Sequence, residues 1–211
     1  GAAVEKLADV TVVALDKTGT LTTGELRVEQ VESYPPGRER EVAQLAFSIE
    51  RLSAHPLARA ITRYGKQQEL TPLTLHGFES ITGRGLRAKH GESEILLGRR
   101  EWLAQGERAK LLARIPQTDT GYSEVWLAHD TLIGRVLLRD DLRPEAAQLV
   151  ATLRQLGLRS VLLTGDRRNA AEFLRDRLKL DDIRAELNPE DKVAIIAGFV
   201  REGRKVAMIG D

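Results

Sequence analysis

Residues 10–22 read VTVVALDKTGTLT, and this stretch decides the fold. Its first six residues are β-branched or aliphatic almost without interruption, which is typical of a strand buried on both faces of a parallel sheet. Asp16 follows directly, where such a strand ends. In an open parallel sheet, ligands bind at the carboxyl ends of the strands. The stretch therefore predicts a carboxylate at the ligand-binding edge of an α/β sheet.

The last third of the chain alternates between strand and helix patterns. Helical patterns cover 144–156, 168–180 and 189–201, and apolar strand patterns cover 158–163, a short segment near Ile183, and 205–209. Alternation of this kind predicts an α/β fold with a doubly wound parallel sheet.

The middle of the chain follows a different pattern. Helices are expected at 39–51, 56–68 and 100–114, and short strands at 73–79, 86–89, 95–97, 124–128 and 131–138. This is an α+β composition, built on an antiparallel sheet and inserted into an α/β one. We therefore expect a core domain of residues 1–27 and 135–211, and an inserted domain of residues 28–134. The two adjacent chain crossings between them would form a hinge.

Composition argues against several classes of partner and site. The 32 basic and 31 acidic residues give a net charge of +1, so no bulk attraction to nucleic acid is expected. There is no cysteine, which excludes disulfides and thiolate metal sites. No apolar run approaches the ~18 residues of a membrane-spanning helix. We expect a soluble, monomeric piece of a longer protein.

Polar groups follow three of the expected strands. They are Asp16 after the first strand, Thr164 and Asp166 after 158–163, and Asp211 after 205–209. A single aspartate of this kind can serve only as a helix cap or turn residue. Three such strand ends converging on one edge of a sheet indicate an active site instead.

The loop at residues 16–22 reads DKTGTLT and places hydroxyls and a glycine after the carboxylate. Such a loop can present both a nucleophile and backbone amides to a phosphate, and attack by Asp16 on phosphorus would give an acyl phosphate. The seven residues match, without a mismatch, the phosphorylation motif of P-type ATPases, whose core is haloacid dehalogenase-like. The chain thus resembles the cytosolic phosphorylation and nucleotide-binding domains of a cation pump. This resemblance implies phosphoryl transfer from ATP to Asp16.

The resemblance implies roles for further residues of the core, which appear in the family's order. Thr164, Gly165 and Asp166 match the family's loop that contacts phosphate and links to the nucleotide. Lys192, in the segment that begins at Pro189, matches the lysine that neutralises charge on the transferring phosphoryl group. By itself, a lysine in this position is more often a solvated helix residue.

A hinge and a magnesium site are implied in the same way. Asp140 and Arg143 resemble the family's Asp-x-x-Arg hinge, which helps to secure the nucleotide. Magnesium requires hard oxygen ligands and usually keeps waters and phosphate oxygens in its shell. The resemblance implies that Asp16, the carbonyl of Thr18 and Asp211 supply the protein's share.

Residues 53–58 read SAHPLA and resemble the signature of heavy-metal-transporting P-type ATPases. A histidine before a proline that begins a helix is more often a structural cap. In this context the resemblance implies contacts with the adenine and the phosphate tail from Glu50, His55, Gly83 and Gly85. Gly98 is followed by Arg99, where many relatives have Gly-Asn, so the chain departs from the family pattern there.

Two other functions fit parts of the pattern. A soluble haloacid dehalogenase-type phosphatase shares the nucleophilic aspartate, but it usually has a second carboxylate two residues later as a general acid–base. Here that position is Thr18, whose hydroxyl cannot serve this role, so the acyl phosphate is expected to persist as a pump requires. A non-catalytic nucleotide-binding module would bind ATP without forming a covalent intermediate.

The resemblance further implies ATP and Mg²⁺ as ligands, and the transmembrane and actuator domains of the same parent protein as partners. It places the chain at the cytosolic face of a membrane. The histidine signature favours a transition metal as cargo, although the membrane helices that select the ion lie elsewhere. Without an actuator domain to direct water, the piece alone is expected to turn over ATP hardly at all.

Overall fold

The computed structural model describes residues 10–118 and 121–210. Among these residues, no helix has the length and apolar character needed to cross a membrane. The predicted metal ligand Asp211 lies outside the described residues.

The chain forms two compact units. Unit 1 combines the residues up to Glu25 with those from Asp140 onward, and unit 2 spans Leu26–Arg139. Both chain crossings lie inside long strands, β2 (Thr22–Tyr34) and β7 (Leu132–Leu142). The sequence places these crossings at 27/28 and 134/135.

Unit 1 is built on a four-stranded parallel sheet with the order β10-β1-β8-β9. Its strands are β1 (Val12–Asp16), β8 (Arg159–Leu163), β9 (Asp182–Arg184) and β10 (Val206–Ile209). The central strand β1 pairs with β8 on one side and β10 on the other. The parallel α/β sheet predicted from the sequence is therefore confirmed.

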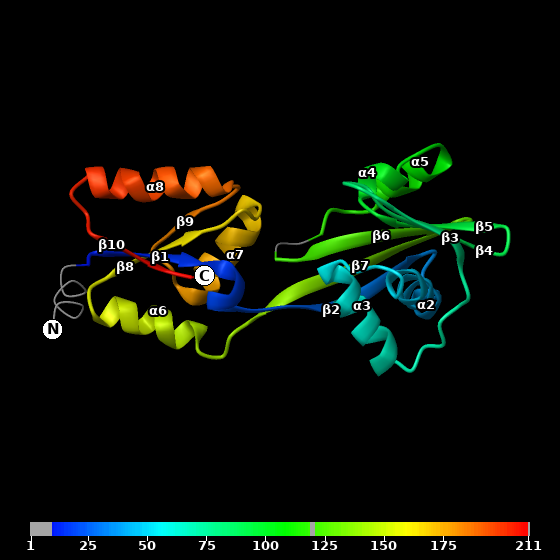
Figure 1. Ribbon diagram of the computed structural model, residues 1–211, viewed down its shortest axis with the longest axis horizontal. Helices are drawn as coiled ribbons and strands as arrows, with labels where there is room; N and C mark the ends of the chain where they lie inside the picture. Colours follow the sequence, from blue (N-terminus) through cyan, green and yellow to red (C-terminus); the bar gives the residue numbers. More distant parts are fainter. Residues whose placement is uncertain (1–9, 119–120, 211) are drawn as a thin grey trace. The chain divides into compact units, whose positions relative to one another are not determined.

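Helices cover both faces of this sheet (Figure 1). The side chains of Val13 and Leu15 pack against α6 (Ala146–Gln155) and α7 (Arg168–Leu178). Those of Val12 and Ala14 pack on the opposite face against α8 (Pro189–Arg201). Successive residues of a strand point to opposite faces, which explains why β1 is apolar at every position before Asp16.

Unit 2 is built on a six-stranded sheet with the order β2-β7-β6-β5-β4-β3. Besides β2 and β7, its strands are β3 (His76–Ile81), β4 (Gly85–His90), β5 (Ser93–Gly98) and β6 (Ser123–His129). The pairs from β3 through β7 are all antiparallel. This confirms the predicted α+β region on an antiparallel sheet.

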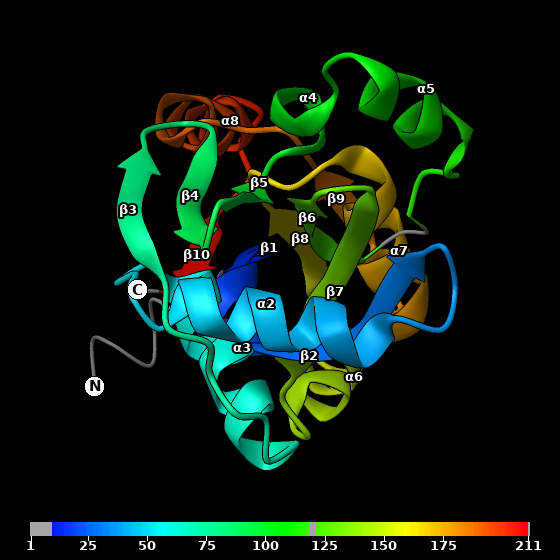
Figure 2. The same cartoon turned by 90° about the vertical axis from the view of Figure 1, so that its right-hand side faces the viewer.

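Two helix pairs cover the two faces of the unit 2 sheet (Figure 2). Helices α2 (Glu39–Glu50) and α3 (Pro56–Gln67) pack on the face that carries Leu97. Helices α4 (Arg100–Leu103) and α5 (Glu107–Arg114) pack on the face that carries Leu96.

Two elements differ from the sequence-based expectation. The expected single helix at 100–114 is two helices, because Gly106 between them has φ +57°, a left-handed conformation that interrupts a right-handed helix. The strand β2 is absent from the expectation, since its apolar residues Leu26, Val28 and Val31 do not alternate regularly and are only partly buried.

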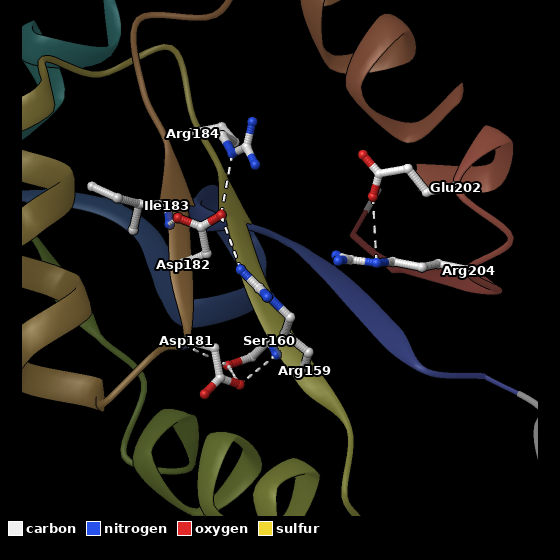
Figure 3. A network of polar contacts seen from close by, with 8 residues as sticks. All are labelled: Arg159, Ser160, Asp181, Asp182, Ile183, Arg184, Glu202 and Arg204. Atoms are coloured by element: carbon white, nitrogen blue, oxygen red, sulfur yellow. Dashed lines mark hydrogen bonds and ion pairs between the residues drawn. The ribbon is translucent and has the colours of Figure 1, made fainter. Parts of the chain in front are cut away.

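The edge strand β9 is attached to β8 by a polar network (Figure 3). The Asp181 carboxylate accepts hydrogen bonds from the backbone N–H and the hydroxyl of Ser160, at 2.8 and 3.3 Å. The Asp182 carboxylate pairs with Arg159 and Arg184, but these arginines are exposed and such pairs contribute little stability. The network fixes the start of β9 beside the start of β8.

Gly65 in α3 provides a test of the packing in unit 2. A Cβ atom at this position would overlap the ring of Phe47 in α2. We expect Gly65→Ala to lower the free energy of unfolding of unit 2 by about 1–3 kcal/mol, because overpacking forces the helices apart. Urea denaturation followed by circular dichroism measures this loss.

Gly198→Ala in α8 is the matched control, since an added Cβ meets nothing within 4 Å. Alanine is a better helix former than glycine by about 1 kcal/mol, so this variant should be slightly more stable than the wild type. Equal stability of Gly65→Ala and the wild type would contradict the close approach of α2 and α3.

Candidate active site

Asp16 is the last residue of β1 and lies half-buried at the carboxyl edge of the parallel sheet. In the strand register, Asp16 is opposite Leu163 of β8, and Leu15 is opposite Ile209 of β10. The residues that follow these partners, Thr164 and Gly210, therefore lie at the same edge. The structure brings together there the strand ends that the sequence singles out, as far as they lie within the described residues.

The residues after Asp16 fold into one tight turn, Lys17–Leu21, before β2 begins. Gly19 has φ +81°, a conformation that a residue with a side chain rarely adopts. The backbone N–H of Thr22 donates to the carbonyl of Lys17, which closes the turn. Thr18 is exposed within it. The turn thus presents a hydroxyl and backbone groups next to the carboxylate.

Lys192 contacts the carboxylate of Asp16, with Nζ 3.2 Å from Oδ1. It comes from the first turn of α8, whose start is fixed by reciprocal hydrogen bonds between Asn188 and Asp191 and by Pro189 at the first helical position. A lysine held by a capped helix end is well placed to neutralise negative charge at Asp16. The sequence named both residues, and the structure places them in contact.

Gly210 packs directly against Asp16. A Cβ atom at Gly210 would lie 2.7 Å from Cβ and 3.1 Å from Oδ2 of Asp16. Any other residue would therefore displace the carboxylate. Gly210 is not among the site residues predicted from the sequence, and the signal for its steric role is its position directly after the strand at 205–209.

The turn Thr164–Asp166 follows β8 and is held by the segment after β9. The buried Thr164 accepts the backbone N–H of Asp166 on Oγ1 at 3.1 Å, and its own N–H donates to the carbonyl of Arg184 at 3.0 Å. Leu187 N–H donates to the Thr164 carbonyl at 3.1 Å. A Cβ at Gly165 would come within 3.1 Å of the Leu187 carbonyl, so little space remains there.

Asp166 forms an ion pair with Lys17, the residue after the candidate nucleophile. This pair ties the turn after β1 to the turn after β8. The family resemblance implies phosphate and nucleotide contacts for Asp166 and gives Lys17 no separate role. Lys17 and Asp166 are far apart in the sequence, so no local sequence pattern predicts their contact.

Asp140 and Arg143 hold the start of β2. The Asp140 carboxylate accepts hydrogen bonds from the hydroxyls of Thr22 (2.6 Å) and Thr23 (3.3 Å), and from the backbone N–H of Gly24 (3.1 Å). Arg143 donates from its backbone to the Leu21 carbonyl and from Nε to the Thr22 carbonyl. These two residues therefore lock together the chain segments at the crossings.

Glu50 ends α2 in unit 2 and is only 4% exposed. Its Oε2 atom is buried and has no hydrogen-bond partner in the described residues. Burial away from water disfavours the ionised form and raises the pKa of the Glu50 carboxyl to about 7. A buried carboxyl oxygen without a partner is costly in a folded protein, so this atom is suited to a polar ligand group.

His55 caps the start of α3 and is exposed. Its Nδ1 accepts the backbone N–H of Leu57 at 3.2 Å, so the neutral ring carries its proton on Nε2. The ring is thereby fixed at one edge, while its faces are available to a stacking partner.

The glycines after β3 complete the predicted nucleotide contacts. Gly85 is paired with Gly98, and a Cβ on Gly85 would come within 2.7 Å of the Gly98 Cα. Gly83 has φ +74° and nothing within 4 Å of an added Cβ. Ile49, Leu57 and Leu86 belong to one core cluster, and they adjoin Glu50, the cap at His55, and Gly85 respectively. Glu50, the His55 cap and Gly85 thus adjoin residues of the main core of unit 2.

Magnesium would find an incomplete ligand set in the described residues. They contain no group of three or more acidic, histidine or cysteine side chains that could hold a metal ion. The Asp16 carboxylate and the exposed Thr18 are at one edge, and the third expected ligand, Asp211, is outside the described range. The hard oxygen donors that are present fit a magnesium ion whose other ligands are water and phosphate.

Comparisons with known proteins agree with this arrangement. A family model for haloacid dehalogenase-like hydrolases matches residues 10–211. The chain is 32% identical to a copper-exporting P-type ATPase of Vibrio cholerae and 34% identical to one of Bacillus subtilis. These matches cover 99% and 100% of the chain, which spans only 23% and 27% of those relatives.

Solved structures of heavy-metal P-type ATPases are also similar to this chain. A zinc-transporting PIB-type ATPase in its E2.Pi state is 34% identical with a TM-score of 0.81, and the match covers 100% of this chain and 34% of that one. The catalytic domain of the CPx-ATPase CopB-B is 28% identical with a TM-score of 0.80, covering 100% and 76%. The resemblance and the fold class predicted from the sequence are thereby confirmed. The chain belongs to the haloacid dehalogenase-like hydrolases, as a homologue of the cytosolic catalytic domain of heavy-metal P-type ATPases.

Proposed function

We propose that this chain is the ATP-binding and phosphorylation unit of an ATP-driven heavy-metal pump. The observation that carries the proposal is the contact between Asp16 and Lys192 at the carboxyl edge of the parallel sheet. A carboxylate oxygen of Asp16 attacks the γ-phosphorus of ATP and forms a new O–P bond. The bond between the γ-phosphorus and the β–γ bridging oxygen breaks, and ADP leaves with that electron pair.

Lys192 and Thr164 would stabilise the group in transfer. The ammonium of Lys192 supplies positive charge where the phosphoryl oxygens accumulate negative charge. The Thr164 hydroxyl oxygen already accepts from Asp166 N–H, so its own proton remains available to a phosphoryl oxygen. The Asp166–Lys17 ion pair would hold the turn after β1 and the turn after β8 in fixed positions during phosphoryl transfer.

The residue two positions after Asp16 distinguishes a pump from a phosphatase. Thr18 cannot act as a general acid–base at neutral pH, and it is exposed in the turn. The aspartyl phosphate would therefore persist until another domain directs water to it. This lifetime favours the pump over the alternative of a soluble phosphatase.

Magnesium would be held by the carboxylate of Asp16, the carbonyl of Thr18 and Asp211. When bound there, the ion would neutralise charge on the phosphate oxygens. Gly210 leaves room for the carboxylate to keep its orientation, because it adds no side chain against Asp16.

Unit 2 would bind the nucleotide through Glu50, His55, Gly83 and Gly85. The buried Oε2 of Glu50 can pair with the exocyclic amine of adenine, and the exposed ring of His55 can stack on the base.

We take unit 1 as the phosphorylation domain and unit 2 as the nucleotide-binding domain. Asp140 and Arg143 would serve as the hinge clamp between the two crossings, and Gly165 would let the phosphate approach its turn.

The whole protein is proposed to be larger, since the chain spans about a quarter of the length of the curated relatives it matches. Transmembrane and actuator domains of the same protein would be its partners, and the chain would lie at the cytosolic face of the membrane. Relatives are described as copper- and zinc-transporting, so a transition metal is the proposed cargo.

The phosphorylation step is tested in the full-length protein that contains this chain. With Mg²⁺ and ATP labelled at the γ-phosphate, we expect an acid-stable, hydroxylamine-sensitive phosphoprotein. Asp16→Asn should abolish the label, because an amide is a far poorer nucleophile, and should leave ATP affinity unchanged. Lys192→Ala should slow labelling by about 10²-fold or more, as for the loss of a transition-state charge contact. Rapid hydrolysis of small phosphate esters without ATP preference would support the phosphatase instead.

The buried carboxyl of Glu50 should make unit 2 sensitive to pH. Its pKa is about 7 in the folded state against an ordinary value of 4.5, so folding favours the protonated form. Stability is then full below pH 4.5 and is lost as the pH rises towards 7. Relative to Glu50→Gln, the wild type should lose about 2–3 kcal/mol of unfolding free energy between pH 5 and pH 8. Urea denaturation at both pH values measures this; a constant difference between the two proteins would refute it.

His55→Gln should weaken ATP binding about tenfold without unfolding unit 2, because stacking of a base on one aromatic ring is worth roughly 1–3 kcal/mol. His90→Gln is the control, since His90 is also exposed but ends β4 at the opposite end of the strand from Gly85. Nucleotide titration followed by NMR should move signals of unit 2. Shifts confined to unit 1 would show that the nucleotide binds elsewhere.

A further inference from the structure

Arg84 and Arg99 are neighbours across the paired glycines of β4 and β5. Gly85 and Gly98 lie opposite each other in the antiparallel register. The next residues outward are Arg84 and Arg99, and the backbone N–H of Arg99 donates to the carbonyl of Arg84 at 3.0 Å. The fold therefore fixes two guanidinium-bearing residues side by side at the end of this strand pair.

Both arginine side chains are exposed, and neither has an ion pair or side-chain hydrogen bond within residues 10–118 and 121–210. Nearby arginines behave differently. Arg87 pairs with Glu79, and Arg100 donates to the carbonyls of Leu112 and Ile115. The two unpaired cations are thus a local feature of the glycine turn, where like charges placed opposite each other destabilise the strand pair.

The backbone beside the two arginines is open at Gly83 and closely packed at the paired glycines. Gly83 meets nothing within 4 Å of an added Cβ, so the turn before Arg84 faces open space. At Gly85 and Gly98 a side chain is excluded, because each would collide with the backbone of the other strand. The paired glycines thus place no side chain of their own beside the two arginines, and the turn at Gly83 leaves open space before Arg84. Guanidinium groups bind phosphate oxygens with two parallel hydrogen bonds each.

The strands that carry the paired glycines pack in the same core as α2, which ends at Glu50, and α3, which His55 caps. Leu86 and Leu97, which adjoin the paired glycines, share a core cluster with Ile49 and Leu57, which adjoin Glu50 and the His55 cap. We propose that Arg84 and Arg99 form a cationic clamp for the polyphosphate tail of the nucleotide, and that this clamp makes unit 2 select nucleoside di- and triphosphates over monophosphates. This inference rests on the proposed nucleotide site and names what determines its phosphate specificity.

The test measures the affinity of the 211-residue protein for ATP, ADP and AMP by isothermal titration calorimetry. Arg84→Ala and Arg99→Asn should each weaken ATP binding about tenfold, as expected for the loss of one charge-assisted contact at an exposed site. AMP affinity should change less than twofold, so the ATP-to-AMP preference should collapse in the double variant. The wild type should also lose ATP affinity more steeply with added salt than the double variant does.

Arg114→Ala is the matched control, because it removes another exposed arginine on α5, which packs on the other face of the unit 2 sheet. It should leave the affinities for all three nucleotides unchanged. Arg99→Lys should restore part of the ATP affinity by restoring the charge. Unchanged ATP affinity in the double variant, or equal losses for ATP and AMP, would overturn the proposal.

Inorganic tripolyphosphate separates this inference from the proposed function. If it binds the wild type and not the double variant, the clamp is supported even when His55→Gln has no effect on ATP and the base site is wrong. If tripolyphosphate binds both proteins equally, the clamp is refuted even when His55→Gln weakens ATP as expected.

Discussion

The pairing of β1 with both β8 and β10 is the constraint on which the candidate active site depends. Because all three strands are parallel, their carboxyl ends meet at one edge, and Asp16 is placed between the turn at Thr164 and Gly210. The side chains of β1 are almost completely buried between helices on both faces, and each fully buried aliphatic side chain contributes roughly 1.5–3 kcal/mol. This burial fixes β1 in height and direction, so Asp16 cannot shift without disrupting the core on both sides of the sheet.

Two ion pairs lie at the carboxyl edge of the parallel sheet, and each lysine contacts a different carboxylate. Lys192 reaches Asp16 from the capped start of α8, and Lys17 turns away to Asp166. If Lys17 also contacted Asp16, two ammonium groups would bind the carboxylate and lower the reactivity of both its oxygens. Its pairing with Asp166 instead leaves one oxygen of Asp16 without a lysine partner, on the side where Gly210 supplies no side chain. The geometry thus combines charge neutralisation at Oδ1 of Asp16 with close packing of Gly210 beside Oδ2.

The sequence predicted most of unit 1 because its signals are local. A continuous apolar run, helix patterns bounded by glycine or proline, and the motif at residues 16–22 each lie within a short window. The unpredicted features depend on contacts between distant segments. The strand β2 is defined by its neighbour β7, about a hundred residues away, and the Asp166–Lys17 and Asp140–Thr22 contacts join opposite parts of the chain. The break at Gly106 was missed for another reason: the helical periodicity continues on both sides of it.

In unit 2, burial and exposure place different chemistry at the proposed nucleotide contacts. Glu50 is buried, and its raised pKa keeps a large fraction of the carboxyl neutral near pH 7, which suits the neutral edge of a base. Arg84 and Arg99 are exposed and remain charged at any physiological pH, which suits a phosphate tail. Exchanging these positions would fail on physical grounds, because an unpaired arginine in the position of Glu50 would carry an uncompensated buried charge. The position of each group relative to water therefore determines which end of a nucleotide it can hold.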